Sequence, residues 1–283
     1  MLGADSHIGK AIHFGLLFFG LLADLNKPAC ALSKGAPVPE DDPIRPLTVS
    51  LYSDDDDCSG VKIASNLILT ARHCRLDRSS RAIFPDGSSY KILRRLVRST
   101  KRTSRRNEYD FAILIIAANI PGPVALIADK PPKNGSRAWI AGYGGKKLTR
   151  TANPLRKLPV QMIDRDYSPS AASVRTLMGG AVCDGDSGGP GYILVRGQIV
   201  VWGIDSAPLD GGPGCSSREV YANVTSERDW IRTIVAGFGH LPGWSPSLSA
   251  IEFGQRKSRS ETSVSRAGRI GRCRTASGAN CHH

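Results

Sequence analysis

The stretch Cys183-Asp184-Gly185-Asp186-Ser187-Gly188-Gly189-Pro190 places one serine among three glycines. Glycine adopts backbone conformations that other residues avoid, so this composition predicts a tight turn. Such a turn exposes the Ser187 hydroxyl and directs backbone N–H groups toward one point. Acyl transfer needs an accessible nucleophile and donors where negative charge develops. An ordinary hairpin turn can have the same composition, so a base, an orienting acid and a pocket must come from elsewhere in the chain.

The 283-residue chain has the composition of a soluble globular protein, with 41% hydrophobic and 22% charged residues. Its formal net charge of +13 is concentrated in residues 91–106 and 254–283. No aromatic residue alternates with the basic ones in 91–106, so nucleic acid is not an expected partner. A solvated surface loop is favoured there, and long-range attraction of anionic partners is the alternative.

Seven cysteines are present, of which four lie in the middle of the chain and three near its ends. There is no C-x-x-C pair, and the histidines lack the spacing of metal ligands, so no metal site is expected. Disulfide bonds are the better interpretation, and they indicate an oxidising compartment.

Residues 1–31 are typical of a signal peptide. Lys10 precedes an apolar run, 11–23, that is too short to cross a bilayer comfortably and suits a signal sequence; a buried core helix is the alternative. Ala29 and Ala31 supply the small residues that predict cleavage after Ala31. We therefore expect a secreted protein, extracellular or periplasmic, with no stable membrane anchor.

Beyond Leu47 the chain is typical of an all-β barrel or sandwich, because short apolar and β-branched segments alternate with glycine and proline. The predicted strands are 47–52, 67–70, 111–116, 138–141, 159–163, 192–195 and 198–202. Proline-rich residues 118–134 predict a linker between two halves. The segment SERDWIRTIV, 226–235, predicts a helix capped by Ser226. The basic tail, 239–283, has few large apolar residues and is expected to be disordered.

His73 follows the strand 67–70 within Thr70-Ala71-Arg72-His73-Cys74, and Asp110 directly precedes the strand 111–116. Each residue alone is more typical of a structural role. The order His, Asp, Ser, with a cysteine directly after the histidine, resembles the chymotrypsin/trypsin family of serine proteases over most of residues 32–236. Further segments are similar to that family: Gly142-Tyr143-Gly144, Trp202-Gly203, Val220-Tyr221 and Trp230-Ile231.

The resemblance implies two six-stranded antiparallel β-barrels with a C-terminal helix and a site in the cleft between them. The protease domain would span 32–238, with barrel one at about 44–117, barrel two at about 135–225 and the helix at 226–236. The disulfides implied are Cys58–Cys74 and Cys183–Cys215.

The resemblance also assigns the chemistry. Ser187 would be the nucleophile, His73 the base and Asp110 the residue that orients the imidazole. The N–H groups of Gly185 and Ser187 would form the oxyanion hole. This chemistry needs no cofactor and no metal.

For specificity, the resemblance places Ala181 at the floor of the primary pocket, Gly203 at its mouth, and Trp202 and Glu219 in its wall. Ala181 stands where a trypsin-like enzyme has aspartate. We expect cleavage after large apolar or aromatic residues, with basic residues accepted through the Glu219 carboxylate. Val201 stands where the family usually has a serine that bonds the catalytic aspartate, so we expect a less firmly oriented Asp110 and modest activity.

Activation in this family pairs the aspartate before the serine, here Asp186, with a newly made N-terminus. Counting back from residues 35–39 places that N-terminus near Leu32, where signal cleavage is also predicted. Leu32-Ser33-Lys34-Gly35 departs from the usual Ile-Val-Gly-Gly. Cleavage after Lys34 is the alternative.

The leading prediction is a monomeric, secreted serine endopeptidase that acts on protein or peptide substrates and is open to protein inhibitors. Two alternatives remain. One is a catalytically weak homologue that binds partners through its basic loop and tail. The other is an esterase on the same scaffold.

Overall fold

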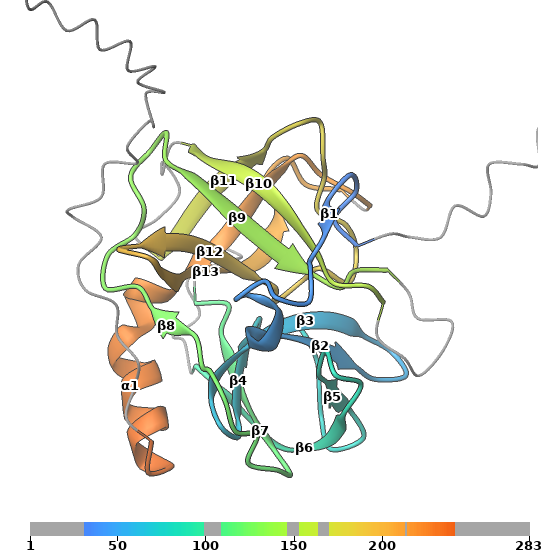
Figure 1. Ribbon diagram of the computed structural model, residues 1–283, viewed down its shortest axis with the longest axis vertical. Coiled ribbons are helices and arrows are strands. Elements are labelled where there is room, and N and C mark those ends of the chain that lie inside the picture. Colours follow the sequence, from blue (N-terminus) through green and yellow to red (C-terminus); the bar gives the residue numbers. More distant parts are fainter. Residues whose placement is uncertain (1–30, 99–108, 146–152, 164–169, 213, 241–283) are drawn as a thin grey trace, which may run out of the picture. The chain divides into compact units, whose positions relative to one another are not determined.

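The computed structural model describes residues 31–98, 109–145, 153–163, 170–212 and 214–240 (Figure 1). The predicted signal peptide up to residue 30, the second half of the basic stretch 91–106, and the basic tail from 241 onward lie outside the described residues. None of the helices in the described part is long and apolar enough to cross a membrane.

The first barrel closes in the order β2-β3-β4-β7-β6-β5, with every neighbouring pair antiparallel. Leucine and isoleucine dominate β4 and β7, and both strands are buried along their whole length. The barrel interior is therefore filled by branched apolar side chains. Its strands are β2 (Thr48–Tyr52), β3 (Asp57–Ala64), β4 (Leu67–Thr70), β5 (Arg81–Ile83), β6 (Ser89–Val97) and β7 (Ala112–Ile116).

The second barrel follows the path β10-β11-β14-β13-β12-β9 and closes through the additional pairing of β9 with β10. Two short strands flank it: β1 (Ala36–Pro37) pairs with β10, and β8 (Leu126–Ile127) runs parallel to β13. The barrel strands are β9 (Arg137–Gly142), β10 (Arg156–Ile163), β11 (Ala171–Thr176), β12 (Pro190–Val195), β13 (Gln198–Pro208) and β14 (Arg218–Asn223).

The helices are short. The 3₁₀ turns η1 (Arg45–Leu47) and η2 (Val224–Glu227) precede β2 and α1 (Arg228–Gly237), respectively. The expectation that Ser226 caps the helix is wrong, because its hydroxyl donates to the carbonyl of Asn223 at 2.7 Å. Instead, Asn223 Oδ1 accepts the N–H of Thr225 at 3.1 Å and caps η2. Two closed six-stranded barrels followed by a helix confirm the predicted fold.

Polar contacts join the two barrels. The Tyr143 hydroxyl donates to the Thr48 carbonyl at 3.1 Å, and Thr48 Oγ1 lies 3.0 Å from the Tyr192 hydroxyl. The Tyr143 N–H donates to Ser59 Oγ at 3.0 Å. Because Ser59 lies on β3 and Tyr143 follows β9, this bond links the barrels beside the turn that carries Ser187.

Candidate active site

Ser187 lies on a turn that only glycine permits. Gly185 and Gly188 have φ angles of +88° and +77°, in the left-handed region. A Cβ at Gly188 would stand 2.1 Å from Thr70 Oγ1, so the first barrel lies directly against the turn. The Ser59 N–H donates to the Ser187 carbonyl at 2.8 Å, and the Cys183–Cys215 disulfide ties the start of the turn to the segment before β14.

Free backbone donors accompany the serine. Asp186 and Gly189 donate their N–H groups within the turn, to the carbonyls of Cys183 and Asp186. The N–H groups of Gly185 and Ser187 have no acceptor among the described residues. Two unpaired donors next to a serine hydroxyl form the arrangement that stabilises an oxyanion.

His73 and Asp110 meet at one end of the first barrel. β4 and β7 are paired so that Thr70 faces Ala112, which brings the residues after β4 beside those before β7. The His73 Nδ1 lies 2.7 Å from Asp110 Oδ2, and the His73 N–H donates to Asp110 Oδ1 at 2.9 Å. The Asp110 side chain is 7% exposed and the His73 side chain 42% exposed, so a buried carboxylate holds an accessible imidazole.

A third bond to Asp110 corrects the expectation about Val201. Ser206, near the end of β13, donates its hydroxyl to Asp110 Oδ2 at 2.6 Å. The expectation that Asp110 lacks a hydroxyl partner is therefore wrong. The expected serine position was Val201, and the serine that bonds Asp110 is Ser206, five residues further along β13. Ser206 is the only serine between Val195 and Cys215, which is the one signal in the sequence that could have identified it.

The charge of Asp110 is stabilised by these bonds. Burial alone would raise the pKa of this carboxyl. The hydrogen bond from His73, the attraction to His73 and the hydroxyl of Ser206 outweigh burial, so the pKa lies below its ordinary value. Asp110 is therefore an anion at neutral pH and can stabilise a protonated imidazole.

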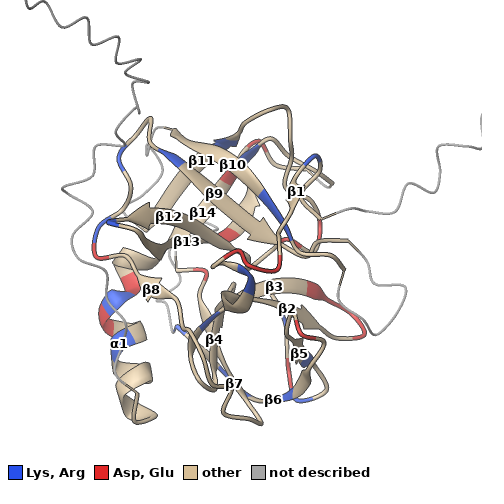
Figure 2. Cartoon of the chain, viewed as in Figure 1, with Lys and Arg blue, Asp and Glu red and all other residues tan. Residues whose placement is uncertain are grey.

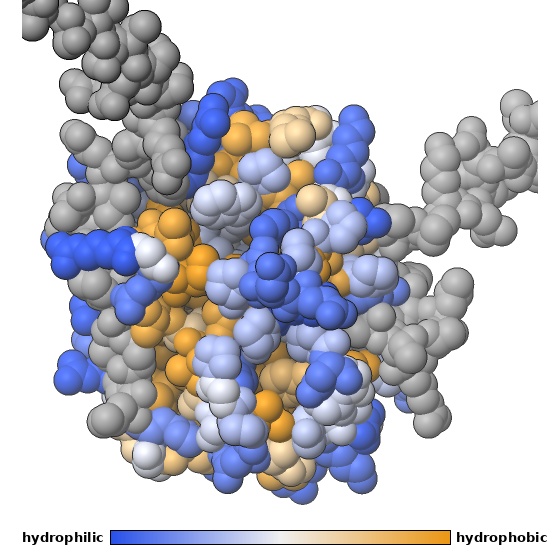
Figure 3. Space-filling view, in the orientation of Figure 1, coloured by the Kyte–Doolittle hydropathy of each residue, from blue (hydrophilic) through white to orange (hydrophobic). Residues whose placement is uncertain are grey.

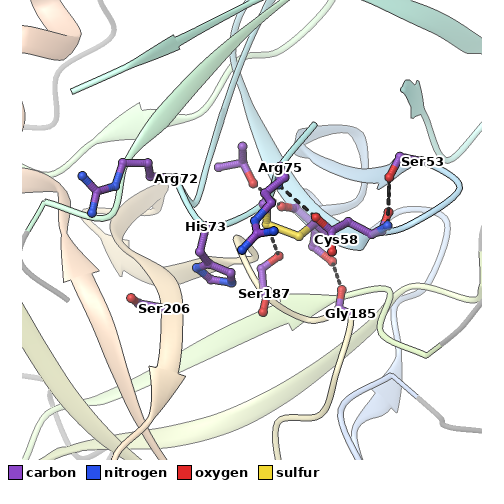
Figure 4. The surroundings of a disulfide bond; sticks show 12 residues. Ser53, Cys58, Arg72, His73, Arg75, Gly185, Ser187 and Ser206 are labelled. Carbon is purple, nitrogen blue, oxygen red and sulfur yellow. Dashed lines mark hydrogen bonds between the residues drawn. A yellow bond between two sulfur atoms is a disulfide. The ribbon is translucent and has the colours of Figure 1, made fainter. Parts of the chain in front are cut away.

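The cleft beside these residues is a cavity of about 530 Å³ lined by His73, Gly185 and Ser187. In Figure 4 Ser187 lies between His73 and Gly185, while Arg72 points away from them. No hydrogen bond joins the side chains of His73 and Ser187 among the described residues, and such bonds often tighten only when substrate binds. The Cys58–Cys74 disulfide lies at the same wall (Figure 4).

The acidic run Asp54–Asp57 lies in the β2–β3 connection and at the start of β3 (Figure 2). Its four residues also line this cavity. Within the described ranges, no group of three or more histidine, cysteine, aspartate or glutamate side chains could hold a metal ion. The run therefore gives the cleft an acidic border.

The predicted pocket residues do not all come together. Ala181 forms a bridge with Ser33, and Glu219 at the start of β14 is buried. Trp202 is fully buried, and its ring centre lies 4.9 Å from that of Tyr221. Its ring also packs directly on Gly191, where a Cβ would stand 2.4 Å from the ring. Because Ser206 contacts Asp110, the part of β13 beside the site is Ser206–Pro208. The expectation that Trp202 and Gly203 border the pocket is corrected accordingly.

Asp186 and Leu32 are brought together. The Leu32 N–H donates to Asp186 Oδ2 at 2.9 Å, and the Cys183 N–H donates to the same oxygen at 3.0 Å. Both residues are almost completely buried. Burial raises the pKa of Asp186 to about 7 despite these bonds.

Comparison with known proteins agrees with this geometry. The sequence profile of the family named Trypsin matches residues 36–231. Beta-fibrinogenase mucrofibrase-5 of Protobothrops mucrosquamatus is 30% identical over 223 residues, which cover 68% of this chain and 83% of that protein. The thrombin-like enzyme elegaxobin-2 of Protobothrops elegans is also 30% identical, with 68% and 91% covered.

Among solved structures, neuropsin, a serine protease expressed in the limbic system of mouse brain, matches with a TM-score of 0.58 and 18% identity. The match covers 72% of this chain and 98% of neuropsin, and at this identity it shows the fold alone. The chain therefore belongs to the trypsin family and is a serine endopeptidase.

Proposed function

We propose that Ser187, His73 and Asp110 hydrolyse peptide bonds through an acyl-enzyme. His73 takes the Ser187 hydroxyl proton while the serine oxygen bonds to the scissile carbonyl carbon. The N–H groups of Gly185 and Ser187 hold the resulting oxyanion. His73 then protonates the leaving amine as the C–N bond breaks, and water later hydrolyses the ester.

The observation that carries this proposal is the buried Asp110, which accepts bonds from both His73 and Ser206. A carboxylate held on two sides fixes the ring orientation and the tautomer that leaves the other ring nitrogen to act as base. A catalytically silent homologue would not need an anion so firmly oriented beside an accessible imidazole.

Fluorophosphonate labelling tests the proposal, because only an activated serine reacts. We expect one label per chain at Ser187, loss of label in Ser187→Ala, and turnover of peptide amides as well as esters. Labelling with ester turnover alone would assign an esterase. No labelling of the correctly folded chain would leave the partner-binding alternative.

For primary specificity we propose large apolar or aromatic residues before the cleaved bond, at P1, with basic residues accepted through Glu219. The half-buried Ala181 supports this because it adds no charge at the floor. Residues 206–208 and 216–219 would form the opposite wall. A peptide library in which only acidic P1 residues are cleaved would contradict the assignment.

For activation we propose that removal of the signal peptide after Ala31 creates the α-amino group that pairs with Asp186. The 2.9 Å bond between the Leu32 nitrogen and Asp186 supports this, since that nitrogen becomes the α-amine on cleavage. N-terminal sequencing of the active enzyme decides between Leu32 and Gly35, the residue exposed by cleavage after Lys34.

The remaining proposals concern setting and partners. Relatives of this chain include a beta-fibrinogenase, a thrombin-like enzyme and the snake venom serine protease serpentokallikrein-2, which supports an extracellular protein that acts on protein or peptide substrates. We further propose that the protease domain spans residues 32–238 and works as a monomer. Protein inhibitors would block it at the cleft. In the described part, the large exposed apolar side chains fall on four separate segments: Leu93 and Val97 on β6, Met178, Leu194 on β12, and Phe238. Figure 3 shows apolar areas interrupted by hydrophilic residues on one face of the molecule. This spread supports a monomer.

A further inference from the structure

Two buried acids lie close to the nucleophile turn: Asp205, which has no role in the proposal above, and Glu219, which that proposal assigns to basic P1 residues. Asp205 is 4% exposed and Glu219 is 3% exposed. Within the described residues neither carboxylate takes part in an ion pair. Buried carboxylates without a cation are costly, and they persist where a function needs them.

Strand pairing puts both acids on one face of the sheet. Asp205 on β13 lies opposite Tyr221 on β14, and Glu219 precedes Tyr221 by two residues. Successive side chains of a strand alternate between faces, so Glu219 shares the face of Tyr221 and hence of Asp205. Diagonal neighbours of this kind lie about 7–8 Å apart at their Cβ atoms, within reach of long side chains.

The backbone of Asp205 pairs with the nucleophile turn. The Gly188 N–H donates to the Asp205 carbonyl, and the Asp205 N–H donates to the Gly189 carbonyl, each at 2.9 Å. On the other side, Val182 and Ser216 exchange two backbone bonds of 2.8 Å, which brings the floor segment against the residues before Glu219. Asp205 therefore lies next to the turn that carries Ser187, and the segment before Glu219 lies next to Val182, the neighbour of Ala181, which the family resemblance places at the floor of the primary pocket.

The Asp205 side chain has an unused acceptor. Its Oδ1 is buried and has no hydrogen-bond partner among the described residues. Burial, then repulsion from Glu219, Asp186 and Asp110, raises the pKa of Asp205 well above its ordinary value. Burial also raises the pKa of Glu219 to about 8; a bond with Ser216 opposes this, while Asp186 and Asp210 add to it. The side chains that act on this pair are thus other acids and the Ser216 hydroxyl, and both carboxyls in turn raise the pKa of the buried Tyr221.

We propose that Asp205 and Glu219 together form a cation-binding site in the wall of the primary pocket, which selects lysine or arginine at P1. The inference rests on the proposed peptidase site and narrows its substrate class. With an apolar side chain in the pocket, the two carboxyls hold a proton. When a guanidinium or ammonium enters, that proton leaves to solvent and both carboxylates accept hydrogen bonds from the cation.

Benzamidine binding tests this without turnover, because the ligand is a planar cation and benzamide is its neutral analogue. Titration calorimetry on the Ser187→Ala chain should show benzamidine binding at least ~10-fold tighter than benzamide. Asp205→Asn and Glu219→Gln should each weaken benzamidine by about 10- to 100-fold and leave benzamide unchanged. Asp229→Asn is the matched control, because this exposed acid on α1 is not among the groups that act on Asp205 or Glu219, and its substitution should change neither ligand. Thermal unfolding verifies that each variant is folded.

Proton release gives a second readout. Near pH 7, benzamidine binding measured in buffers of different ionisation enthalpy should release up to about one proton, and benzamide none. Equal affinity for the two ligands, or benzamidine binding that neither Asp205→Asn nor Glu219→Gln weakens, would overturn the proposal. Failure of the peptidase proposal is separate, since it would appear as absent fluorophosphonate labelling while benzamidine binding stays as described.

Discussion

The pairing of Leu32 with Asp186 predicts that one cleavage reverses the effect of pH on stability. In a chain that continues before Leu32, the nitrogen bonded to Asp186 is a neutral amide. The carboxyl is 2% exposed, and burial raises its pKa from 3.8 to about 7. In a chain that begins at Leu32, the same nitrogen is a cationic amine, which favours the carboxylate and lowers this pKa.

The magnitude follows from linkage. A group whose folded pKa is raised stabilises the fold fully below its unfolded pKa, and that stability is lost as pH rises through the folded pKa. The interval from 3.8 to about 7 corresponds to about 4 kcal/mol, at about 1.4 kcal/mol per pH unit. The extended chain should therefore lose about 4 kcal/mol of unfolding free energy between pH 4 and pH 8 through this one group.

The assay is urea unfolding at pH 4, 6 and 8 in the Ser187→Ala background, which prevents self-digestion. One chain begins at Leu32, and the other carries a short Gly-Ser extension before it. Asp205 and Glu219 are present in both chains, so the difference between the chains reports the state of Asp186, including its repulsion of these two carboxyls. Asp186→Asn should remove that difference. Equal pH dependence of the two unsubstituted chains would refute the reasoning.

Three further changes have defined expectations. Ser206→Ala removes a bond to a buried anion worth about 1.5–3 kcal/mol, so kcat should fall about 10- to 100-fold with the fold intact; unchanged kcat would contradict the positioning role. Gly188→Ala brings a Cβ to within 2.1 Å of Thr70 Oγ1 at a positive φ, and should abolish fluorophosphonate labelling and lower Tm; normal labelling would show that the turn relaxes. Replacing Cys58 and Cys74 by serine opens a loop with a sequence separation of 16 and should cost about 3 kcal/mol in urea unfolding. A cost near zero would mean that barrel packing alone holds the loop.

The nucleophile turn and the meeting of His73 with Asp110 could be predicted from the sequence, because local composition determines both. The glycines around Ser187 have the backbone angles that the turn needs, and the apolar strands 67–70 and 111–116 pair so that His73 and Asp110 meet. The wall of the pocket depends on where β13 ends, which local composition does not reveal. Gly203 and Asp205 are both unfavourable in strands, so the predicted strand stopped at residue 202, although β13 continues to Pro208. Long-range pairing with Gly188 and Gly189 extends the strand and sets its register.

Four buried carboxylates lie on or near the elements that position Ser187, and three of them take part in no ion pair among the described residues. Asp110 has a folded pKa below its ordinary value, because His73 and Ser206 already serve it. Asp186, Asp205 and Glu219 have raised pKa values, and each repels at least one of the others. We propose that the α-amine of Leu32 pairs with Asp186, and that a cationic substrate side chain pairs with Asp205 and Glu219. The α-amine of Leu32 would neutralise Asp186 and so remove its repulsion on Asp205 and Glu219, which lowers the pKa of both. At pH 8, benzamidine binding should accordingly release fewer protons from the chain that begins at Leu32 than from the extended chain, and equal proton release would contradict this coupling.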